Sequence, residues 1–516
     1  MDKLYRALCA PGSLKTVTGI ATTSSALEDS TAIYCSAGGD SYESRSSTTT
    51  THKDEEAAVA HPQPAKQRVL DRWLDKVVSA AGSTPSFTII LIALLVWVFL
   101  GIPYGKSENW QILISDVQAV FCYIYDSLLM RQTFNIYQDH MRVAATLQSR
   151  NITLNRMVNK LVNDENYTET RKIALAELSR PIHDEHTLKV SWVGKTCNFT
   201  SGVLGHWFAS VVFWLGVVAW LGCGPYMSWS DEWELYMNSA TSAAMLFIFG
   251  FVANMGERFA QYTNETLQHL HTLDAELETK LRVLSNDRTP NEVVTIAPQK
   301  VGKLQRAVFY YADLVGTLTG LAILTGVIVL WVCIGPALRF NSNWWLIIGT
   351  YAGLIGMHDA VVLRNIHHQL AKYEDSAYQT VHRQDQALFS SVHPELAWTS
   401  TEPIPSSSQR ISIWLSNVCA HTWSVVVVAL TVVVLITIAT IMKWSVTGQL
   451  ICNVPPSILE TSLMMILITG HNVSDGHQKE QLEEIRVRRL RLTRWVDAMG
   501  KAVRAVDTTA VLTEKA

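Results

Sequence analysis

Charged residues are scarce in this chain. Only 17% of its 516 residues are Asp, Glu, Lys or Arg, whereas soluble globular domains contain roughly 25%. Hydrophobic residues make up 48% of the sequence, and 17 residues are Trp. The composition therefore excludes an ordinary soluble domain for most of the chain, and it indicates long segments that lie in apolar surroundings.

Short catalytic motifs are absent as well. The sequence contains no HExxH zinc motif, no P-loop and no nucleophile elbow, which are the signals of metalloproteases, nucleotide hydrolases and serine hydrolases. The histidine boxes of membrane di-iron oxygenases are also missing. We therefore expect a protein that is not an enzyme and that has no permanently bound cofactor.

The apolar residues are gathered in eight runs, most of them near the length that a helix needs to cross a hydrocarbon core. They form four pairs, and a short Trp-containing loop joins the two runs of each pair. The loops occur in VWVFLGIPYGKSENWQILI, AWLGCGPYMSWSDEWELYM, LWVCIGPALRFNSNWWLII and, degraded, IATIMKWSVTGQLICNV. The predicted spans are 85–101, 112–131, 203–223, 236–254, 314–335, 344–363, 422–442 and 452–470. This pattern predicts an all-α integral membrane protein of four helical-hairpin repeats around a pseudo-fourfold axis.

The basic residues predict the orientation of the chain in the membrane. The four short loops hold only Lys106, Arg339 and Lys443 of the 42 Lys and Arg residues. Because basic residues gather on the cytoplasmic side, both termini and the long loops should be cytoplasmic. Residues 1–65 have no apolar h-region, so they do not form a secretory signal.

Five segments follow from the repeat. We expect a disordered cytoplasmic tail and then four units, each with two spans and a long polar helix. The polar helices carry Leu at helical spacing, which favours a cytoplasmic bundle. The boundaries are 1–70 for the tail and 71–187, 188–299, 300–408 and 409–516 for the four units.

Polar residues are concentrated in the even-numbered spans, whereas the odd-numbered spans are almost purely apolar. An ionisable group at membrane depth costs at least about 2.5–3.5 kcal/mol unless it faces a partner or a wet cavity. We therefore expect the even spans to line a centre and the odd spans to face lipid. The candidate metal ligands are Asp116, Cys122, Asp126, His358, Asp359, Glu460, Met464 and His471.

These residue types suit a transported cation. Glu460, Met464 and His471 fall on one face of a helix, and Cys122 lies one turn before Asp126. Carboxylate, imidazole and sulfur together favour a first-row divalent metal. The predicted path begins at an acidic outer mouth (Glu108, Asp231, Glu232 and Glu234) and passes Asp116, Glu460 and then Asp126 with His358 and Asp359.

Structural explanations remain open for the same residues. Asp126 could pair with Arg131, and Asp359 could pair with Arg364. The cluster from His183 to His186 could bind incoming metal, but an exposed polar turn is the simpler interpretation.

Residues 71–140 resemble the fungal low-affinity iron permease family. The segment DRWLDKVVSAAGSTPSFTIILIALLVWVFLGIPYGKSENWQILISDVQAVFCYIYDSLLMRQ has its amphipathic helix, its Ala-Gly-Ser turn and the Trp-Gln before the second span. Arg131, Gln132 and Asn135 match the polar cluster where that span ends. The fourth repeat departs from the pattern at Lys443-Trp444 and Pro455-Pro456, which predicts a distinct mouth or a broken helix start there.

The resemblance implies a plasma-membrane importer of Fe²⁺ that also moves Zn²⁺, Cu²⁺ and Mn²⁺. Its expected partners are divalent metal ions and the lipid bilayer, with no nucleic acid, and a homo-oligomer through the cytoplasmic helices stays open. Two rival functions also stay open, a cation channel and a membrane scaffold or sensor that transports nothing.

Overall fold

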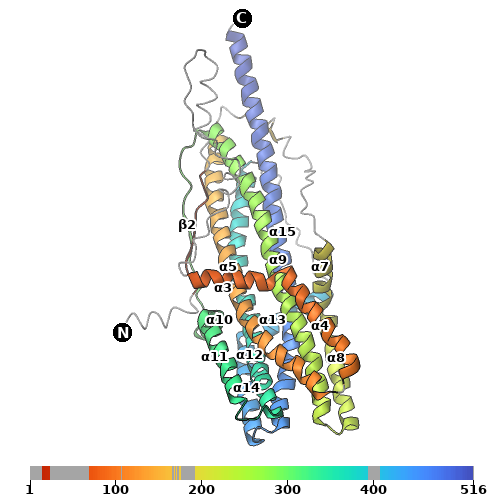
Figure 1. The fold of residues 1–516 in the computed structure, drawn as a ribbon. Helices are drawn as coiled ribbons and strands as arrows, with labels where there is room; N and C mark the ends of the chain where they lie inside the picture. Colours follow the sequence, from red (N-terminus) through yellow and green to blue (C-terminus); the bar gives the residue numbers. More distant parts are fainter. Residues whose placement is uncertain are drawn as a thin grey trace, which may run out of the picture.

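The fold was obtained as a computed structural model and is almost entirely helical (Figure 1). It describes residues 14–23, 69–105, 107–164, 192–392 and 407–514, with isolated positions between 168 and 175. Most of the predicted tail and the cluster from His183 to His186 lie outside the described residues.

Each of four successive segments contains a short helix, an outer helix and a long helix. The short helices are α3 (Val69–Gly82), α7 (Trp192–Leu204), α10 (Lys303–Val315) and α13 (Ser407–Cys419). The outer helices are α4 (Thr84–Tyr104), α8 (Trp207–Cys223), α11 (Leu318–Ile334) and α14 (Thr422–Ile441). The long helices are α5 (Glu108–Asn163), α9 (Asp231–Ser285), α12 (Ser342–Val392) and α15 (Val446–Glu514).

Seven helices are long and apolar enough to cross a membrane within the described residues, or eight if the bent pair α10 and α11 forms one span. The apolar stretches of α4, α8 and α14 are only 6%, 11% and 17% buried, whereas those of the four long helices are 67–78% buried. The long helices therefore form the inner layer and the outer helices face the surroundings, as the distribution of polar residues predicts.

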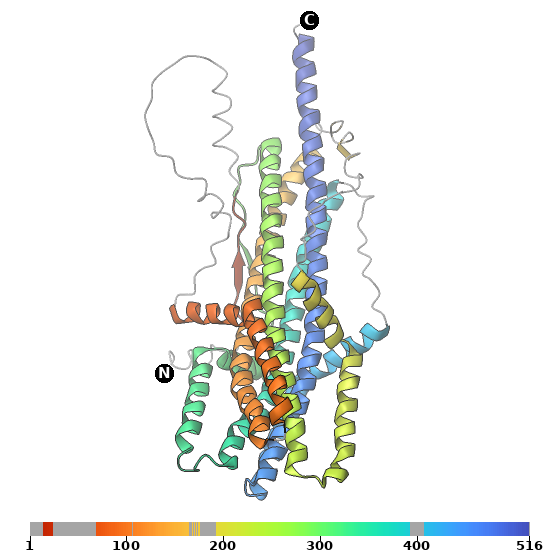
Figure 2. The same ribbon diagram turned by 45° about the vertical axis from the view of Figure 1, so that its right-hand side comes forward.

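The four long helices form a closed ring. Contacts join α5 to α9, α9 to α15, α15 to α12 and α12 to α5. Outside this ring, α4 packs on α9, α8 on α15, α14 on α12 and α11 on α5 (Figure 2). Each outer helix thus lies against a long helix of another segment, and the segments follow one another around the ring in the order one, two, four, three.

A polar residue precedes each outer helix, and its side chain caps the helix in three cases, all but Thr317 before α11. His206 and His421 accept hydrogen bonds from the backbone N–H groups of Phe208 and Trp423, and Ser83 does the same for Ser86. Such side-chain acceptors start a new helix. The predicted third and fifth spans therefore begin too early, because α8 and α11 start only after these breaks.

Stacked Trp pairs close three of the four hairpins. The rings of Trp97 and Trp110 lie 4.3 Å apart and nearly parallel, and each indole N–H donates to the other residue's carbonyl. The same arrangement joins Trp220 to Trp233 at 3.9 Å and Trp331 to Trp344 at 4.4 Å. Each pair satisfies two indole donors where the chain turns.

The fourth hairpin keeps the turn of the two before it but lacks the Trp pair. The N–H of Trp444 donates to the Ala439 carbonyl, as that of Phe340 donates to Gly335. Lys443 and Trp444 have positive φ, like the matching residues of the third hairpin. Gly448 therefore stands where Trp344 stands. The expected broken start is wrong, since α15 runs without a break through Pro455 and Pro456.

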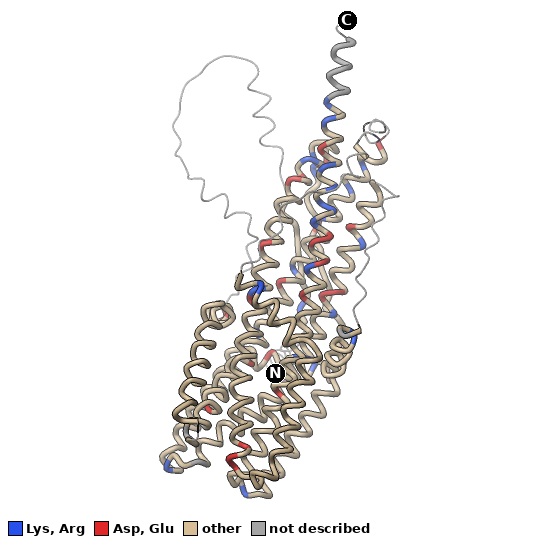
Figure 3. Tube along the Cα trace, turned by 90° about the vertical axis from the view of Figure 1, so that its right-hand side faces the viewer, with Lys and Arg blue, Asp and Glu red and all other residues tan. Residues whose placement is uncertain are grey.

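Beyond the apolar stretches the long helices continue as a four-helix stalk. We define the stalk as residues 140–163, 263–285, 374–392 and 478–504. Leu154, Leu277, Leu388 and Leu492 belong to one buried cluster in it. Lys and Arg gather along this half of the molecule, and the hairpin half carries few charges (Figure 3).

A buried charge network joins the four helices of the stalk. Arg489 is 1% exposed and donates to Asp274, Asp385 and Asn151. Burial alone lowers the pKa of Arg489, but the carboxylates of Asp385 and Asp274 outweigh this effect and raise its pKa. One residue from each long helix therefore meets at a single guanidinium.

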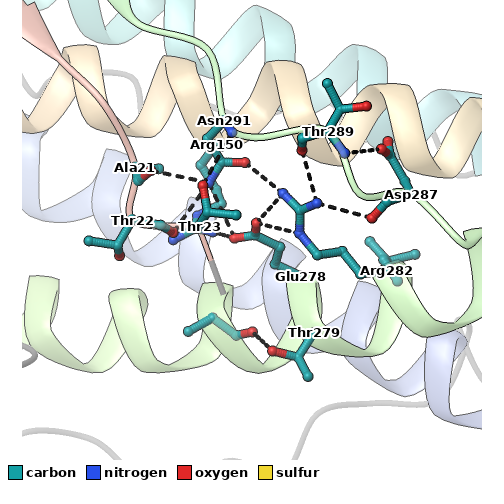
Figure 4. Close-up of polar contacts among 12 residues, drawn as sticks. Ala21, Thr22, Thr23, Arg150, Glu278, Thr279, Arg282, Asp287, Thr289 and Asn291 are labelled. Atoms are coloured by element: carbon teal, nitrogen blue, oxygen red, sulfur yellow. Dashed lines mark hydrogen bonds and ion pairs between the residues drawn. The ribbon is translucent and has the colours of Figure 1, made fainter. Parts of the chain in front are cut away.

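Part of the predicted disordered tail is ordered. Strand β1 (Val17–Gly19) pairs antiparallel with β2 (Val294–Ile296), and the pair lies along α5. Ala21 is held at both ends, because its N–H donates to Ser149 and its carbonyl accepts from Asn291 (Figure 4). The prediction of disorder is wrong for residues 14–23, since they have hydrogen-bond partners on β2, at Asn291 and at Ser149 of α5.

Replacement of Arg489 by Met should destabilise the stalk. The substitution removes the cation that Asp274 contacts and leaves Asp385 with Arg488 alone; one broken buried pair costs about 3–5 kcal/mol. We expect a lower midpoint in thermal unfolding of the purified protein. The exposed Lys501, replaced by Met, is the matched control, and equal midpoints for the two variants would contradict the role of the network.

Candidate functional site

A polar layer lies at the end of the ring nearest the hairpin turns. Ser115, Asn238 and Gly349 each stand five residues after the Trp that closes their hairpin, and Asn453 stands five residues after Gly448. Asn238 donates to Ser115 at 2.8 Å. A Cβ on Gly349 would lie 2.9 Å from the Asn453 amide nitrogen. The absence of a side chain at Gly349 therefore lets this amide reach between the helices.

Glu460 occupies the next turns of α15 toward the stalk. Its side chain is fully buried, and neither carboxylate oxygen has a hydrogen-bond partner. The carboxylate lies directly against Gly356 of α12, where a Cβ would meet its oxygens at 2.5 and 2.6 Å. Gly356 thus provides the space in which this carboxylate lies.

Asp126 lies deeper in the ring, on α5. It is also fully buried, and neither of its carboxylate oxygens has a hydrogen-bond partner. Its charge interacts with those of Glu460 and Asp359. Counted from Trp110 and Gly448, Asp126 is four residues further along its helix than Glu460, which corresponds to about 6 Å along the axis.

Sulfur atoms stand beside these carboxylates. The buried thiol of Cys122 interacts electrostatically with Glu460 and Asp126. Met464 is fully buried one turn after Glu460, at the register position of Asp126. On α5 a sulfur atom (Cys122) precedes a carboxylate (Asp126), and on α15 a carboxylate (Glu460) precedes a sulfur atom (Met464).

Asp359 has a hydrogen-bond partner, unlike Asp126 and Glu460. One oxygen accepts a hydrogen bond from the Tyr311 hydroxyl at 2.6 Å, and the other has no partner. His358 lies on the outer side of α12, where its ring meets that of Tyr311 at 4.8 Å. Its Nδ1 also lies 3.6 Å from the Asp359 Oδ1 atom, so His358 stands beside Asp359 but on the side of α10.

Neither of the pairings left open by the sequence occurs. Arg131 contacts Asp75 of α3 at 2.7 Å and Asp71 at 3.6 Å, instead of Asp126. Arg364 donates to the carbonyl and hydroxyl of Ser416 on α13, instead of to Asp359. Both guanidinium groups reach outward to the short helices, so among the described residues neither Asp126 nor Glu460 has a basic partner.

The remaining candidate ligands lie on either side of the central carboxylates, toward the hairpin turns and toward the stalk. Asp116 is buried in the outer part of α5, and one of its oxygens has no partner. Among the outer acids, Asp231 accepts from Thr447, and the side chain of Glu108 lies outside the described residues. His471 lies at the other end, with its ring 4.0 Å from that of His367.

A small cavity of about 40 Å³ continues the inner end of the ring toward the stalk. His140 and Glu374 form an ion pair at 3.2 Å on its wall, and His471 and Asp475 also line it. A space of this size holds about one water molecule. The polar lining of the ring therefore extends beyond the apolar stretches.

Two central residues, Met245 and Gly356, were missed by the sequence analysis. Met245 stands as far beyond Trp233, and Gly356 as far beyond Trp344, as Glu460 stands beyond Gly448. Counting from the hairpin Trp would have found both. Their types, a thioether and a bare backbone, carry no charge that marks them as unusual in an apolar span.

The described residues contain no group of three or more His, Cys, Asp or Glu side chains arranged to hold a metal ion at once. The carboxylates follow one another along the ring instead of converging. Such an arrangement offers one or two protein ligands at each level. It suits weak, successive contacts better than a permanent metal centre.

Comparison with known proteins identifies similar chains. The profile of a family described as low affinity iron permease matches residues 408–509. The low-affinity iron/zinc ion transport protein fet4 of Schizosaccharomyces pombe is 34% identical over 81% of this chain and 72% of its own. The low-affinity Fe(2+) transport protein of Saccharomyces cerevisiae is 31% identical over 83% of each chain. No solved structure matches.

Replacement of Gly356 by Ala should disturb the centre selectively. A Gly in a helix is normally less favourable than Ala by about 1 kcal/mol, so the change would stabilise an unconstrained site. At Gly356 the added methyl group must displace the Glu460 carboxylate, and we expect a lower midpoint in thermal unfolding.

The matched control is Gly326→Ala on α11, where a Cβ would have no neighbour within 4 Å. We expect this variant to equal or exceed the parent protein in thermal midpoint. A Gly356→Ala protein as stable as the Gly326→Ala protein would show that Glu460 does not lie against α12.

Proposed function

Because the chain belongs to the low-affinity iron permease family, we propose that it imports Fe²⁺ across the plasma membrane along the axis of its inner ring. Zn²⁺ follows as a second cargo from the relative whose name includes it. Cu²⁺ and Mn²⁺ are further cargoes in this proposal, since oxygen, nitrogen and sulfur ligands bind all four metals.

One observation carries the proposal. All four carboxylate oxygens of Asp126 and Glu460 are buried in the inner ring without a hydrogen-bond partner. Burial of an unpaired ionised carboxylate costs several kcal/mol. No basic side chain balances these groups, because Arg131 and Arg364 point away from them. A mobile divalent cation is the partner that this arrangement requires.

The cation passes the acidic outer end, then Asp116, then Glu460 with Cys122, and then Asp126 with Met464 and Asp359. Each level offers few protein ligands, so the ion keeps part of its water shell and is released easily. An inside-negative potential contributes about 4.6 kcal/mol per 100 mV for a divalent ion. This gradient drives inward movement without a nucleotide.

We infer further that the four helix segments are repeats around a pseudo-fourfold axis. Asn151, Asp274 and Asp385 stand equally far beyond the Trp that closes their hairpins, and Arg489 stands at the same distance beyond Gly448. These four residues meet in the stalk. A shared register over this length supports four equivalent helices. The excess of basic residues along the stalk supports a cytoplasmic position for it and for both termini.

The inner end of the path lies before the stalk. The cavity lined by His140, Glu374 and His471 precedes the Leu cluster and the Arg489 guanidinium along the axis. A buried positive charge repels a divalent cation, so the ion leaves the axis between the helices at the level of this cavity.

Neutral substitutions in the path should abolish transport without unfolding the protein. We expect Asp126→Asn and Glu460→Gln each to lower Fe²⁺ uptake into liposomes at least about tenfold, equivalent to about 1.4 kcal/mol in the barrier. The amides keep the size of the carboxylates and remove the charge that replaces the water of the ion. Uptake is measured with purified protein at an imposed inside-negative potential.

Glu265→Gln on α9 is the matched control, because this residue is exposed outside the apolar stretch. Uptake at the parental rate in both path variants would exclude the carboxylate path. A parent protein that moves no metal would leave only a scaffold or sensor, and unitary currents in a planar bilayer would identify a channel.

A further inference from the structure

Arg364 is a buried cation that forms no ion pair with any residue of the described part of the chain. It lies on α12 just beyond the apolar stretch and is 2% exposed. Its Nη2 donates to the carbonyl and the hydroxyl of Ser416 on α13. Its Nε and Nη1 have no hydrogen-bond partner. Burial of an unbalanced charge costs several kcal/mol, so this side chain requires an anion.

Arg131 is a second buried arginine whose charge, unlike that of Arg364, is balanced by nearby carboxylates. It lies at a similar level of α5, because its distance along the chain from Trp110 differs by only one residue from that between Arg364 and Trp344. Arg131 has two carboxylates within reach, Asp75 at 2.7 Å and Asp71 at 3.6 Å. The described surroundings of Arg364 contain no such ion pair. Carboxylates therefore balance the charge of Arg131, whereas no carboxylate of the described residues pairs with Arg364.

Arg364 belongs to the wall of a cavity. This cavity of about 280 Å³ lies between α12, α13 and α15. Lys372, His368 and the amide of Asn417 also line it, so further donors surround the guanidinium. The space far exceeds the roughly 30 Å³ that one water molecule occupies in the liquid, and it admits a group the size of phosphate.

Two neighbouring residues define the site more closely. A Cβ on Gly470 of α15 would lie 3.0 Å from Cζ and Nη1 of Arg364, so the guanidinium packs flat against this helix. Asp375 is the acidic residue of the lining. Its carboxylate accepts from Gln379 at 2.8 Å and contacts His477 and Gln481 at 3.1 Å each. It is therefore occupied by other partners.

We propose that this cavity binds a phosphate-type oxyanion beside the guanidinium group of Arg364. A guanidinium group forms charge-assisted hydrogen bonds to phosphate oxygens, and Lys372 adds a second positive charge at the rim. The site is separate from the central carboxylates and does not depend on the transport proposal. The phosphate group can belong to a cytosolic anion or to a lipid headgroup of the inner leaflet.

The test is a thermal-shift titration of the purified full-length chain with two sources of phosphate. Lipid-depleted protein in detergent is titrated with inorganic phosphate and, at equal ionic strength, with chloride. In parallel, the protein is placed in phosphatidylcholine vesicles with and without phosphatidic acid. We expect saturable stabilisation by at least one phosphate source and none by chloride.

Substitutions connect this response to the cavity. Arg364→Gln should lower the affinity about tenfold to a hundredfold, because it removes hydrogen bonds to a charged group. Lys372→Gln, at an exposed position, should lower it about fivefold and covers the case in which Arg364→Gln does not fold. Arg410→Gln, an exposed arginine of α13, should bind like the parent.

The outcomes are distinct. Stabilisation by inorganic phosphate supports a soluble ligand, and stabilisation by phosphatidic acid alone supports a lipid headgroup. No response to either phosphate source, or an equal response in the parent and in both cavity variants, would overturn the site. Metal uptake does not enter this test, so its failure would leave the transport proposal untouched.

Discussion

Two carboxylates without protein partners are the constraint from which the rest of this molecule follows. Asp126 and Glu460 are buried in an apolar ring of helices, and none of their oxygens is hydrogen-bonded. Ionisable groups at membrane depth are rare, and they mark substrate or ion pathways and proton relays. The surrounding features serve this arrangement: Gly356 leaves room for one carboxylate, and Arg131 is held away from the other by α3.

The long helices are fixed at both ends and carry their unpaired groups in the middle. Stacked Trp pairs close three hairpins at one end, and Arg489 joins all four helices at the other. Between these layers a large hydrophobic cluster packs the long helices, and small residues such as Gly349 and Gly353 allow a close approach to Asn453. The unpaired carboxylates of Asp126 and Glu460 therefore lie within a packed apolar surrounding.

The sequence predicts the helices and their layers well, because both depend on local properties. Apolar runs of spanning length and the polar even-numbered spans are enough to separate inner from outer helices. Contacts between segments far apart in the sequence could not be predicted in this way. Strand Val17–Gly19 is three residues long and pairs with residues far along the chain. His358 precedes Asp359 but faces Tyr311 of another helix, which no periodicity within α12 indicates.

The central residues of the ring also fall into those that the sequence identifies and those that it does not. Charge at membrane depth identified Asp126, Asp359 and Glu460, which interact electrostatically in the structure. Gly356 and Met245 have no such signal and are found only by comparing register positions among the four hairpins. The partners of Arg131 and Arg364 lie on short helices whose positions depend on how the chain turns back at the membrane surface.

Anomalous X-ray scattering from crystals of the protein grown with Fe²⁺ tests the central claim most directly. The account predicts a peak in the inner ring beside the carboxylates of Asp126 and Glu460. An empty ring at saturating Fe²⁺, with both carboxylates hydrogen-bonded to neighbouring side chains, would contradict it.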